Sequence, residues 1–154
     1  EADVDFIGEL ESLLYQSEMD MTLFFRRLNQ FDENNPNEFW KKLEESSYSA
    51  TLEKFKPQWT DFLKNYAEIL IAENGEKTER TAAMNLVNPK YVLRNYMAQL
   101  AIDAADAGDY SIVNELFNLL LKPYDEQPES EKWFAKRPDW AKEKAGCSML
   151  SCSS

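Results

Sequence analysis

Residues 88–110 read NPKYVLRNYMAQLAIDAADAGDY and predict a helix with both a start signal and a stop signal. Pro89 suits the first turn of a helix, where its missing N–H costs nothing, and Asn88 before it can supply a capping oxygen. Gly108 suits the left-handed residue that ends a helix. At 100° per residue, four apolar side chains fall within about 40° of one another, namely Leu93, Met97, Leu100 and Ala104. We therefore expect an amphipathic helix that places Leu100 at the centre of a core and Gln99 in water.

A second helix is predicted directly after this one. Asp109 can cap it, and Pro123 stops it. Its apolar residues recur at helical spacing and are Ile112, Val113, Leu116, Phe117 and Leu120. Two helices joined by a Gly-Asp turn form a helical hairpin.

The first part of the chain predicts further helices. One covers residues 3–16, with an apolar stripe of Val4, Ile7, Leu10 and Leu14. Asp20 can cap a second helix, which carries Arg26 and Arg27 away from its apolar stripe of Leu23, Phe24, Leu28 and Phe31. Asn35 and Pro36 open a short third helix.

Residues 50–72 keep helical spacing for longer than any other part of the chain. Pro57 lies inside this pattern, so we expect a kink, or a new helix that starts near Lys56. Asn74-Gly75 provides a left-handed stop, and a short helix follows over residues 80–85.

Residues 123–154 lack a sustained period but contain Tyr124, Trp133, Phe134 and Trp140. Disordered segments are poor in aromatic residues, so we expect this tail to pack. The predicted fold is all-α: a bundle of roughly six or seven helices over residues 1–122, with an irregular C-terminal tail over 123–154 wrapped on it as part of one domain.

Composition limits the chemistry. The chain of 154 residues has 17 basic and 28 acidic residues and no histidine, which gives a net charge of −11. Such a surface repels phosphate backbones and anionic lipid, so neither nucleic acid nor membrane is an expected partner. Histidine catalysis and histidine-ligated metals are excluded, and no Gly-rich phosphate loop is present. We expect no catalytic, cofactor-binding or metal-ligating residue in this chain, and no binding of ATP by it.

Three acidic pairs have the residue types of catalytic carboxylate pairs or Mg²⁺ ligands, namely Glu9/Glu11, Glu44/Glu45 and Asp103/Asp106. They are interpreted as solvated helix faces. Arg94, beside the small residues Ala98 and Ala101, either holds a carboxylate or phosphate or is a partly buried structural arginine, and the structural interpretation is favoured.

Cys147 and Cys152 lie in a Ser-rich end without apolar pattern. This context argues against a packing role for either sulfur. Two thiols without histidine do not complete a zinc site. The remaining alternatives are a redox function and two exposed thiols of no importance.

Several short motifs resemble the C-terminal end of the selenoprotein O family (SelO, or YdiU). They are NPKYVLRN at 88–95, the GDY turn, KPYD at 122–125, KRPDW at 136–140 and the final SCSS. The resemblance implies a protein-kinase-like protein adenylyltransferase, or pseudokinase, that transfers AMP from ATP to protein hydroxyls with Mg²⁺. This chain would be its C-terminal helical domain, inactive alone, with an upstream kinase-like domain and protein substrates as partners. The location would be cytoplasmic in a bacterium and mitochondrial in a eukaryote.

Within this resemblance, Asn88, Pro89, Arg94, Asn95, Gly108 and Asp109 are assigned structural roles. Cys152 is third from the end, where the family carries cysteine or selenocysteine, which implies a redox role. Cys147 does not match the closer spacing of the family, and whether Cys152 pairs with Cys147 or with a cysteine elsewhere stays open. A chain that starts at Glu1 is expected to be a fragment of a longer enzyme. The rival interpretation is a stand-alone helical protein-interaction module, and the full open reading frame distinguishes the two.

Overall fold

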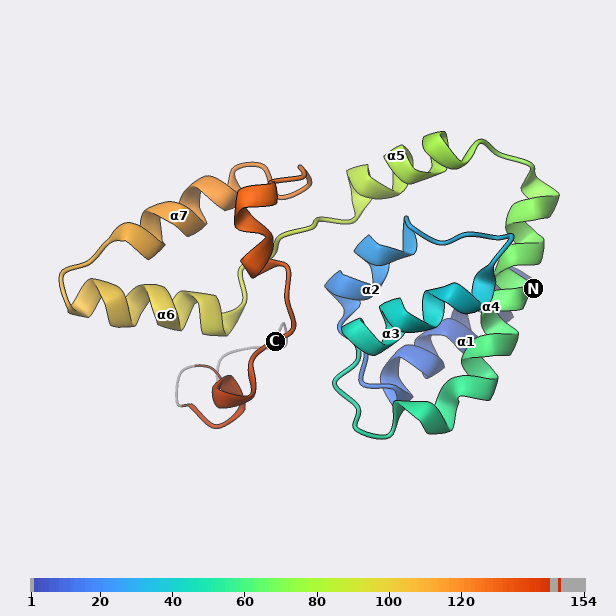
Figure 1. Ribbon diagram of the computed structural model, residues 1–154, viewed down its shortest axis with the longest axis horizontal. Coiled ribbons are helices and arrows are strands. Elements are labelled where there is room, and N and C mark those ends of the chain that lie inside the picture. Colours follow the sequence, from blue (N-terminus) through green and yellow to red (C-terminus); the bar gives the residue numbers. More distant parts are fainter. Residues whose placement is uncertain (1, 145–146, 148–154) are drawn as a thin grey trace. The chain divides into compact units, whose positions relative to one another are not determined.

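The computed structural model describes residues 2–144 and 147. Seven α-helices and four 3₁₀ helices follow one another along this part of the chain (Figure 1). The α-helices are α1 (Ala2–Gln16), α2 (Met21–Leu28), α3 (Trp40–Ser46), α4 (Lys56–Glu73), α5 (Lys77–Val87), α6 (Asn95–Asp106) and α7 (Ser111–Leu120). The 3₁₀ helices are η1 (Pro36–Phe39), η2 (Leu52–Phe55), η3 (Pro128–Trp133) and η4 (Asp139–Lys142).

The all-α prediction is confirmed: the described residues form no strand, and their single bridge pairs Met19 with Ser47. None of the described helices combines the length and apolar character that crossing a membrane requires.

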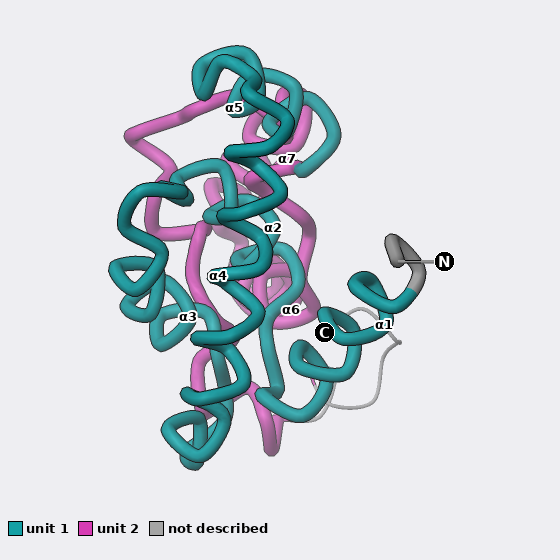
Figure 2. Tube along the Cα trace, turned by 90° about the vertical axis from the view of Figure 1, so that its right-hand side faces the viewer, with its two compact units in different colours: residues 1–88 teal, residues 89–154 magenta. Residues whose placement is uncertain are grey.

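The chain divides into two compact units, Glu1–Asn88 and Pro89–Ser154 (Figure 2). Each unit has its own group of buried apolar side chains. This division falls between Asn88 and Pro89, whereas the sequence analysis placed its boundary after residue 122. The difference arises because the α6–α7 hairpin shares its core with residues 133 and 141 of the predicted tail.

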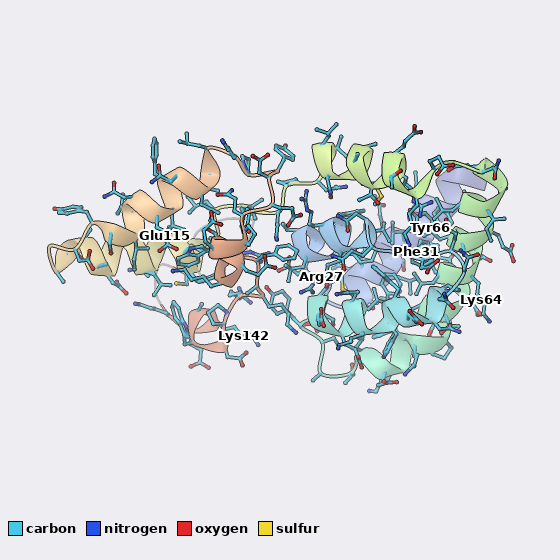
Figure 3. All side chains as sticks on the ribbon, turned by 45° about the horizontal axis from the view of Figure 1, so that its top comes forward. Arg27, Phe31, Lys64, Tyr66, Glu115 and Lys142 are labelled. Atoms are coloured by element: carbon cyan, nitrogen blue, oxygen red, sulfur yellow. The ribbon has the colours of Figure 1, made fainter. Side chains whose placement is uncertain are left out.

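Aromatic rings dominate the core of the first unit. Trp59 on α4 is fully buried, with Phe24 of α2 at 5.6 Å and Phe62 at 5.8 Å between ring centroids. Phe31 follows α2 and lies beside Tyr66 of α4, at 5.0 Å (Figure 3). Ring pairs at such distances favour tilted or edge-on packing, which fixes how α2 and α4 meet.

The apolar stripe of α1 is rotated from the predicted one. Ile7 is 54% exposed, whereas Leu13 and Leu14 are buried. Phe6 stacks on Phe62 at 4.6 Å, so it replaces Ile7 on the inner face. The prediction is confirmed for Leu14 and Leu10, which belong to the core or pack on it, and is wrong for Ile7. Residues 6, 10, 13 and 14 also satisfy helical spacing, and an aromatic ring buries more apolar area than isoleucine does.

The capping prediction for α2 is confirmed, because the Leu23 N–H donates to Asp20 Oδ1 at 3.1 Å. Arg26, which was predicted to lie off the apolar stripe, is nevertheless buried, since it is only 3% exposed. Its guanidinium donates to the carbonyls of Asn85 (3.2 Å) and Asn88 (2.9 Å) at the end of α5. Carbonyls at a helix C-terminus lack partners within the helix and carry negative partial charge, so they suit a buried arginine.

Proline and left-handed residues end helices largely as predicted. Pro57 stands in the first turn of α4, which starts at Lys56 after the separate helix η2. Asn74 adopts the left-handed conformation (φ 49°) that ends α4. Gly108 is also left-handed (φ 84°), and it ends the turn between α6 and α7.

The start predicted for the helix at Asn88-Pro89 is wrong. Asn88 instead ends α5, because its N–H donates to the Met84 carbonyl at 2.9 Å. Residues 89–94 then form no helix, and the N–H groups of Lys90 and Tyr91 both donate to the Pro123 carbonyl, at 2.8 and 3.1 Å. In the first turn of a helix, the N–H groups of Lys90 and Tyr91 would have no partner within the helix and would bond to water. Here both groups bond to the Pro123 carbonyl instead, and α6 starts only at Asn95.

This shift moves the centre of the second core. Met97 is fully buried, Leu100 is only partly buried and Leu93 is 52% exposed. Leu116 and Leu119 of α7 complete the contact with α6, while Val113 and Phe117, which were predicted on the same stripe, are exposed. Among the predicted tail aromatics, Trp133 is buried, whereas Trp140 and Tyr124 are 44% and 43% exposed.

Candidate functional site

Two of the motifs named above, separated by α6 and α7, come together in the second unit. The non-helical segment 89–94 carries Lys90 and Tyr91, and the segment 123–131 supplies their partners. The double hydrogen bond to the Pro123 carbonyl joins the two backbones directly. Hydrogen bonds therefore hold together residues that are 36 to 41 positions apart in the sequence. We call this group the Lys90 cluster, and its members are Lys90, Tyr91, Glu126, Gln127 and Glu131.

The ammonium of Lys90 is the charged centre of this cluster. The side chain is only 7% exposed, and Nζ lies 2.7 Å from Glu126 Oε2 and 2.6 Å from Glu131 Oε2. Burial lowers the pKa of Lys90, but the hydrogen bonds to the two carboxylates outweigh burial, so the net pKa lies above its ordinary value. A lysine held as a cation in this way anchors charge, because its lone pair is not free to act as a nucleophile or base.

The ring of Tyr91 lies beneath the Lys90 ammonium, with Nζ 5.6 Å from the ring centroid. Tyr91 is 1% exposed, and its hydroxyl donates to the Gln127 carbonyl at 3.0 Å. Burial raises the pKa of the Tyr91 hydroxyl. The Gln127 amide in turn donates to the carbonyls of Leu119 (3.1 Å) and Lys122 (2.9 Å), and so it caps the end of α7.

The other residues assigned structural roles lie nearby or in the hairpin turn. Arg94 is buried at 7% exposed and directly precedes α6, rather than lying within a helix as predicted, and its N–H contacts Met97 Sδ at 3.4 Å. Asn95 is the first residue of α6. Asp109 Oδ1 accepts from the Ser111 N–H at 2.8 Å, which lowers the pKa of this carboxyl and fixes the start of α7.

Cys147 packs in the core of the second unit, contrary to the prediction from its Ser-rich surroundings. It is 1% exposed and belongs to the same apolar group as Met97, Leu119 and Trp133. Its thiol is unpaired with another cysteine. Cys152, the residue to which the redox role was assigned, lies outside the described residues.

Carboxylates on the hairpin bind cations of the chain itself. Glu115 of α7, labelled in Figure 3, accepts from Lys132 at 2.7 Å and from Trp133 Nε1 at 2.8 Å. The Lys132 contact is the main cause of the lowered pKa of Glu115. Asp103 of α6 pairs with Lys144, and this contact likewise lowers the pKa of the Asp103 carboxyl.

A metal site built from the chain alone needs several donor side chains in one place. Over residues 2–144 and 147, no three Asp, Glu or Cys side chains are placed to hold a metal ion.

A hollow in the first unit lies where α1 turns into α2. It has a volume of about 460 Å³ and is lined by Leu14, Tyr15, Met19, Met21, Glu11 and Glu18. Its only charges are negative, so it suits an apolar group better than a phosphate. Glu18 adopts a left-handed conformation (φ 47°) at this turn.

The Lys90 cluster was not predicted from the sequence. Lys90 was seen as part of a helix, and no spacing rule connects it with Glu126 and Glu131 at separations of 36 and 41 residues. The available signal was the pair of motifs NPKYVLRN and KPYD, which the resemblance identified without showing that they touch.

Comparison with known proteins identifies relatives along the whole chain. A family model described as Protein adenylyltransferase SelO matches residues 1–121. A protein of Flavobacterium johnsoniae named Protein nucleotidyltransferase YdiU is 53% identical over 159 residues, which cover 100% of this chain and 30% of that protein. Proteins of the same name from Methylobacillus flagellatus and Rhodopirellula baltica are 52% and 42% identical, covering 96% and 100% of this chain and 28% and 31% of theirs.

Fold and comparisons together define an all-α chain related to protein nucleotidyltransferases. The chain belongs to the SelO family, as the motif resemblance predicted. It spans about 30% of the length of the curated relatives that it matches.

Proposed function

We propose that this chain is the C-terminal helical part of a SelO-type enzyme, a kinase-like protein adenylyltransferase. The full-length enzyme transfers AMP from ATP to Ser, Thr or Tyr hydroxyls of proteins. The observation that carries this proposal is the match of the SelO family model over residues 1–121. Relatives named as nucleotidyltransferases, at 53% and 52% identity, support it.

The reaction is a displacement at the α-phosphorus of ATP. The protein hydroxyl oxygen forms a bond to this phosphorus, the bond between the α- and β-phosphates breaks, and pyrophosphate leaves while the hydroxyl loses its proton. No step of this reaction is assigned to the described residues. ATP and Mg²⁺ are proposed for the full-length enzyme only.

The contribution proposed for this chain is structural. The cations of the Lys90 cluster and of the Glu115 site are held by carboxylates of the same unit and brace the α6–α7 hairpin against residues 123–133. The net charge of −11 supports protein partners, namely the rest of the enzyme and its substrates, over nucleic acid or membranes. A regulatory thiol at Cys152 is proposed from the family resemblance.

Labelled ATP tests the proposal. Full-length enzyme with Mg²⁺ and ATP labelled at the α-phosphate should transfer the label to itself or to a protein substrate, and ATP labelled at the γ-phosphate should transfer none. The 154-residue chain alone is the matched control and should transfer neither. Transfer of the γ-label would show a kinase instead, and transfer of the α-label by the chain alone would overturn the structural role.

The open reading frame supplies a second test. A Gly-rich loop, a β-strand lysine and a metal-binding aspartate upstream of Glu1 are expected. A frame that encodes no such elements would favour the stand-alone interaction module.

A further inference from the structure

Helix α7 has two apolar faces. The inner face carries Leu116 and Leu119, which are buried against α6. Four more large apolar side chains point elsewhere and are 61%, 41%, 65% and 64% exposed, namely Tyr110, Val113, Phe117 and Leu121. A helix at the surface ordinarily has a polar outer face, so a second apolar face requires an explanation.

These four side chains form one continuous stripe, which we call the α7 outer stripe. At 100° per residue, they lie within about 80° of one another along the helix and its two flanking residues. The only charged residue of α7 is Glu115, which falls about 160° away from Phe117 and pairs with Lys132. One side of the stripe carries asparagine rather than charge, at Asn114 and Asn118.

The stripe contains no charged residue, whereas 29% of the residues of the whole chain are charged. Depletion of charged residues and enrichment in aromatic residues are the features that mark the buried centre of a protein interface. The composition of the α7 outer stripe therefore matches a surface that another apolar surface covers.

The area of the stripe indicates which partner covers it. From their exposed fractions, the four side chains offer on the order of 400 Å², about half of the roughly 800 Å² that each partner contributes to a stable complex between separate proteins. A contact within one polypeptide needs less area, because the linked parts meet at a high effective concentration. The matched relatives have about 70% of their length outside the part that corresponds to this chain.

We propose that Tyr110, Val113, Phe117 and Leu121 form the face on which the remainder of the full-length polypeptide packs. This inference deepens the proposed function, because it rests on the chain being part of a longer enzyme. The covering surface is apolar and presents no charge to the stripe, since an unpaired charge buried there would be costly.

Photo-crosslinking in the full-length protein tests the partner. With p-benzoylphenylalanine in place of Phe117, irradiation and peptide mapping should give crosslinks to residues that precede Glu1 in the same molecule. The same probe in place of Asp106, an exposed residue of α6, is the matched control and should give few. Crosslinks to a second copy, or to residues 1–88 of this chain, would each overturn the proposal.

Thiol labelling tests whether the stripe is covered. In the Phe117→Cys variant, the new thiol should be labelled at least tenfold more slowly in the full-length protein than in the 154-residue chain, as followed by peptide mapping. Equal rates would overturn the proposal. Transfer of AMP by the same full-length sample is measured separately, so that an inactive protein with the expected crosslinks contradicts the proposed function alone.

Discussion

The indole N–H of Trp59 donates to Ser17 Oγ at 2.8 Å, and both residues are 0% exposed. This bond joins the residue that follows α1 to the first turn of α4 inside the aromatic core of the first unit. A buried indole N–H without an acceptor would lose its bond to water and gain nothing in return. The serine is therefore part of the core, although it is polar.

Ser17→Ala should lower the free energy of unfolding by about 1–3 kcal/mol, because it leaves the Trp59 N–H unsatisfied. Ser12→Ala is the matched control: its hydroxyl accepts only an exposed bond from Gln16, so the effect should be within about 0.5 kcal/mol. Urea titrations followed by circular dichroism measure both changes. Equal effects would show that the buried bond contributes nothing.

Gly108→Ala should destabilise the hairpin by about 1 kcal/mol. Its φ of 84° is unfavourable for alanine, and no atom lies within 4 Å of the added methyl group, so the cost is purely conformational. Gly8→Ala provides the opposite case, since Gly8 lies within α1 in open space and should gain about 0.5–1 kcal/mol. Thermal melts compare the two variants, and a shift of the same sign in both would contradict the interpretation.

Met97→Ala should cost about 2–5 kcal/mol, because Met97 is fully buried in the second core. Leu100→Ala should cost less, since Leu100 only packs at the edge of that core. Gln99→Ala should cost about 0.5 kcal/mol or less, because the amide makes an exposed bond to Asp103. If the Leu100 variant were less stable than the Met97 variant, the helix would have the orientation predicted from the sequence, with Leu100 at the centre of the core.

The Lys90 cluster should lose stability at high pH. The folded-state pKa values of Lys90 and Tyr91 both lie above their ordinary values, so the folded state holds these protons more tightly than the unfolded chain. Their contribution is complete below the unfolded values, about 10.4 for lysine and 10 for tyrosine, and is lost as the pH rises through the folded values. As the pH rises from 8 to 11, the urea midpoint of unfolding should fall less steeply in a Lys90→Met/Tyr91→Phe variant than in the unsubstituted protein. Identical slopes in both proteins would exclude the cluster as the cause.

The two cysteines should differ in reactivity. Cys147 is covered by the second core and should be labelled slowly under native conditions. The redox hypothesis requires that Cys152 is accessible and reduced, so it should react fast, and in the oxidised full-length enzyme it should pair with a cysteine outside this chain. Peptide mapping distinguishes the sites. A slow Cys152, or an oxidised form that contains only a Cys147–Cys152 bond, would contradict the hypothesis.

Local signals predicted the ends of most helices in this fold. Pro57 and Gly108 act through their own backbone geometry, which a neighbouring chain does not change. Asn88-Pro89 gave an equally clear signal for the start of a helix, and this prediction was wrong. The carbonyl of Pro123, which is distant in sequence, accepts hydrogen bonds from the N–H groups of Lys90 and Tyr91. The prediction for Cys147 was wrong for the same reason, because its burial depends on Met97 and Leu119 and not on its serine-rich neighbours. The Lys90 cluster consists entirely of such distant contacts.

The Pro123 carbonyl also affects how this chain can be shortened. The family match ends at residue 121, two positions before the carbonyl that receives the Lys90 and Tyr91 N–H groups. A clone that stops at the end of the match would retain both helices of the hairpin but remove Trp133 and Ala141 from its core. Expression boundaries for members of this family should therefore be drawn at or beyond residue 147 rather than at the limit of sequence similarity.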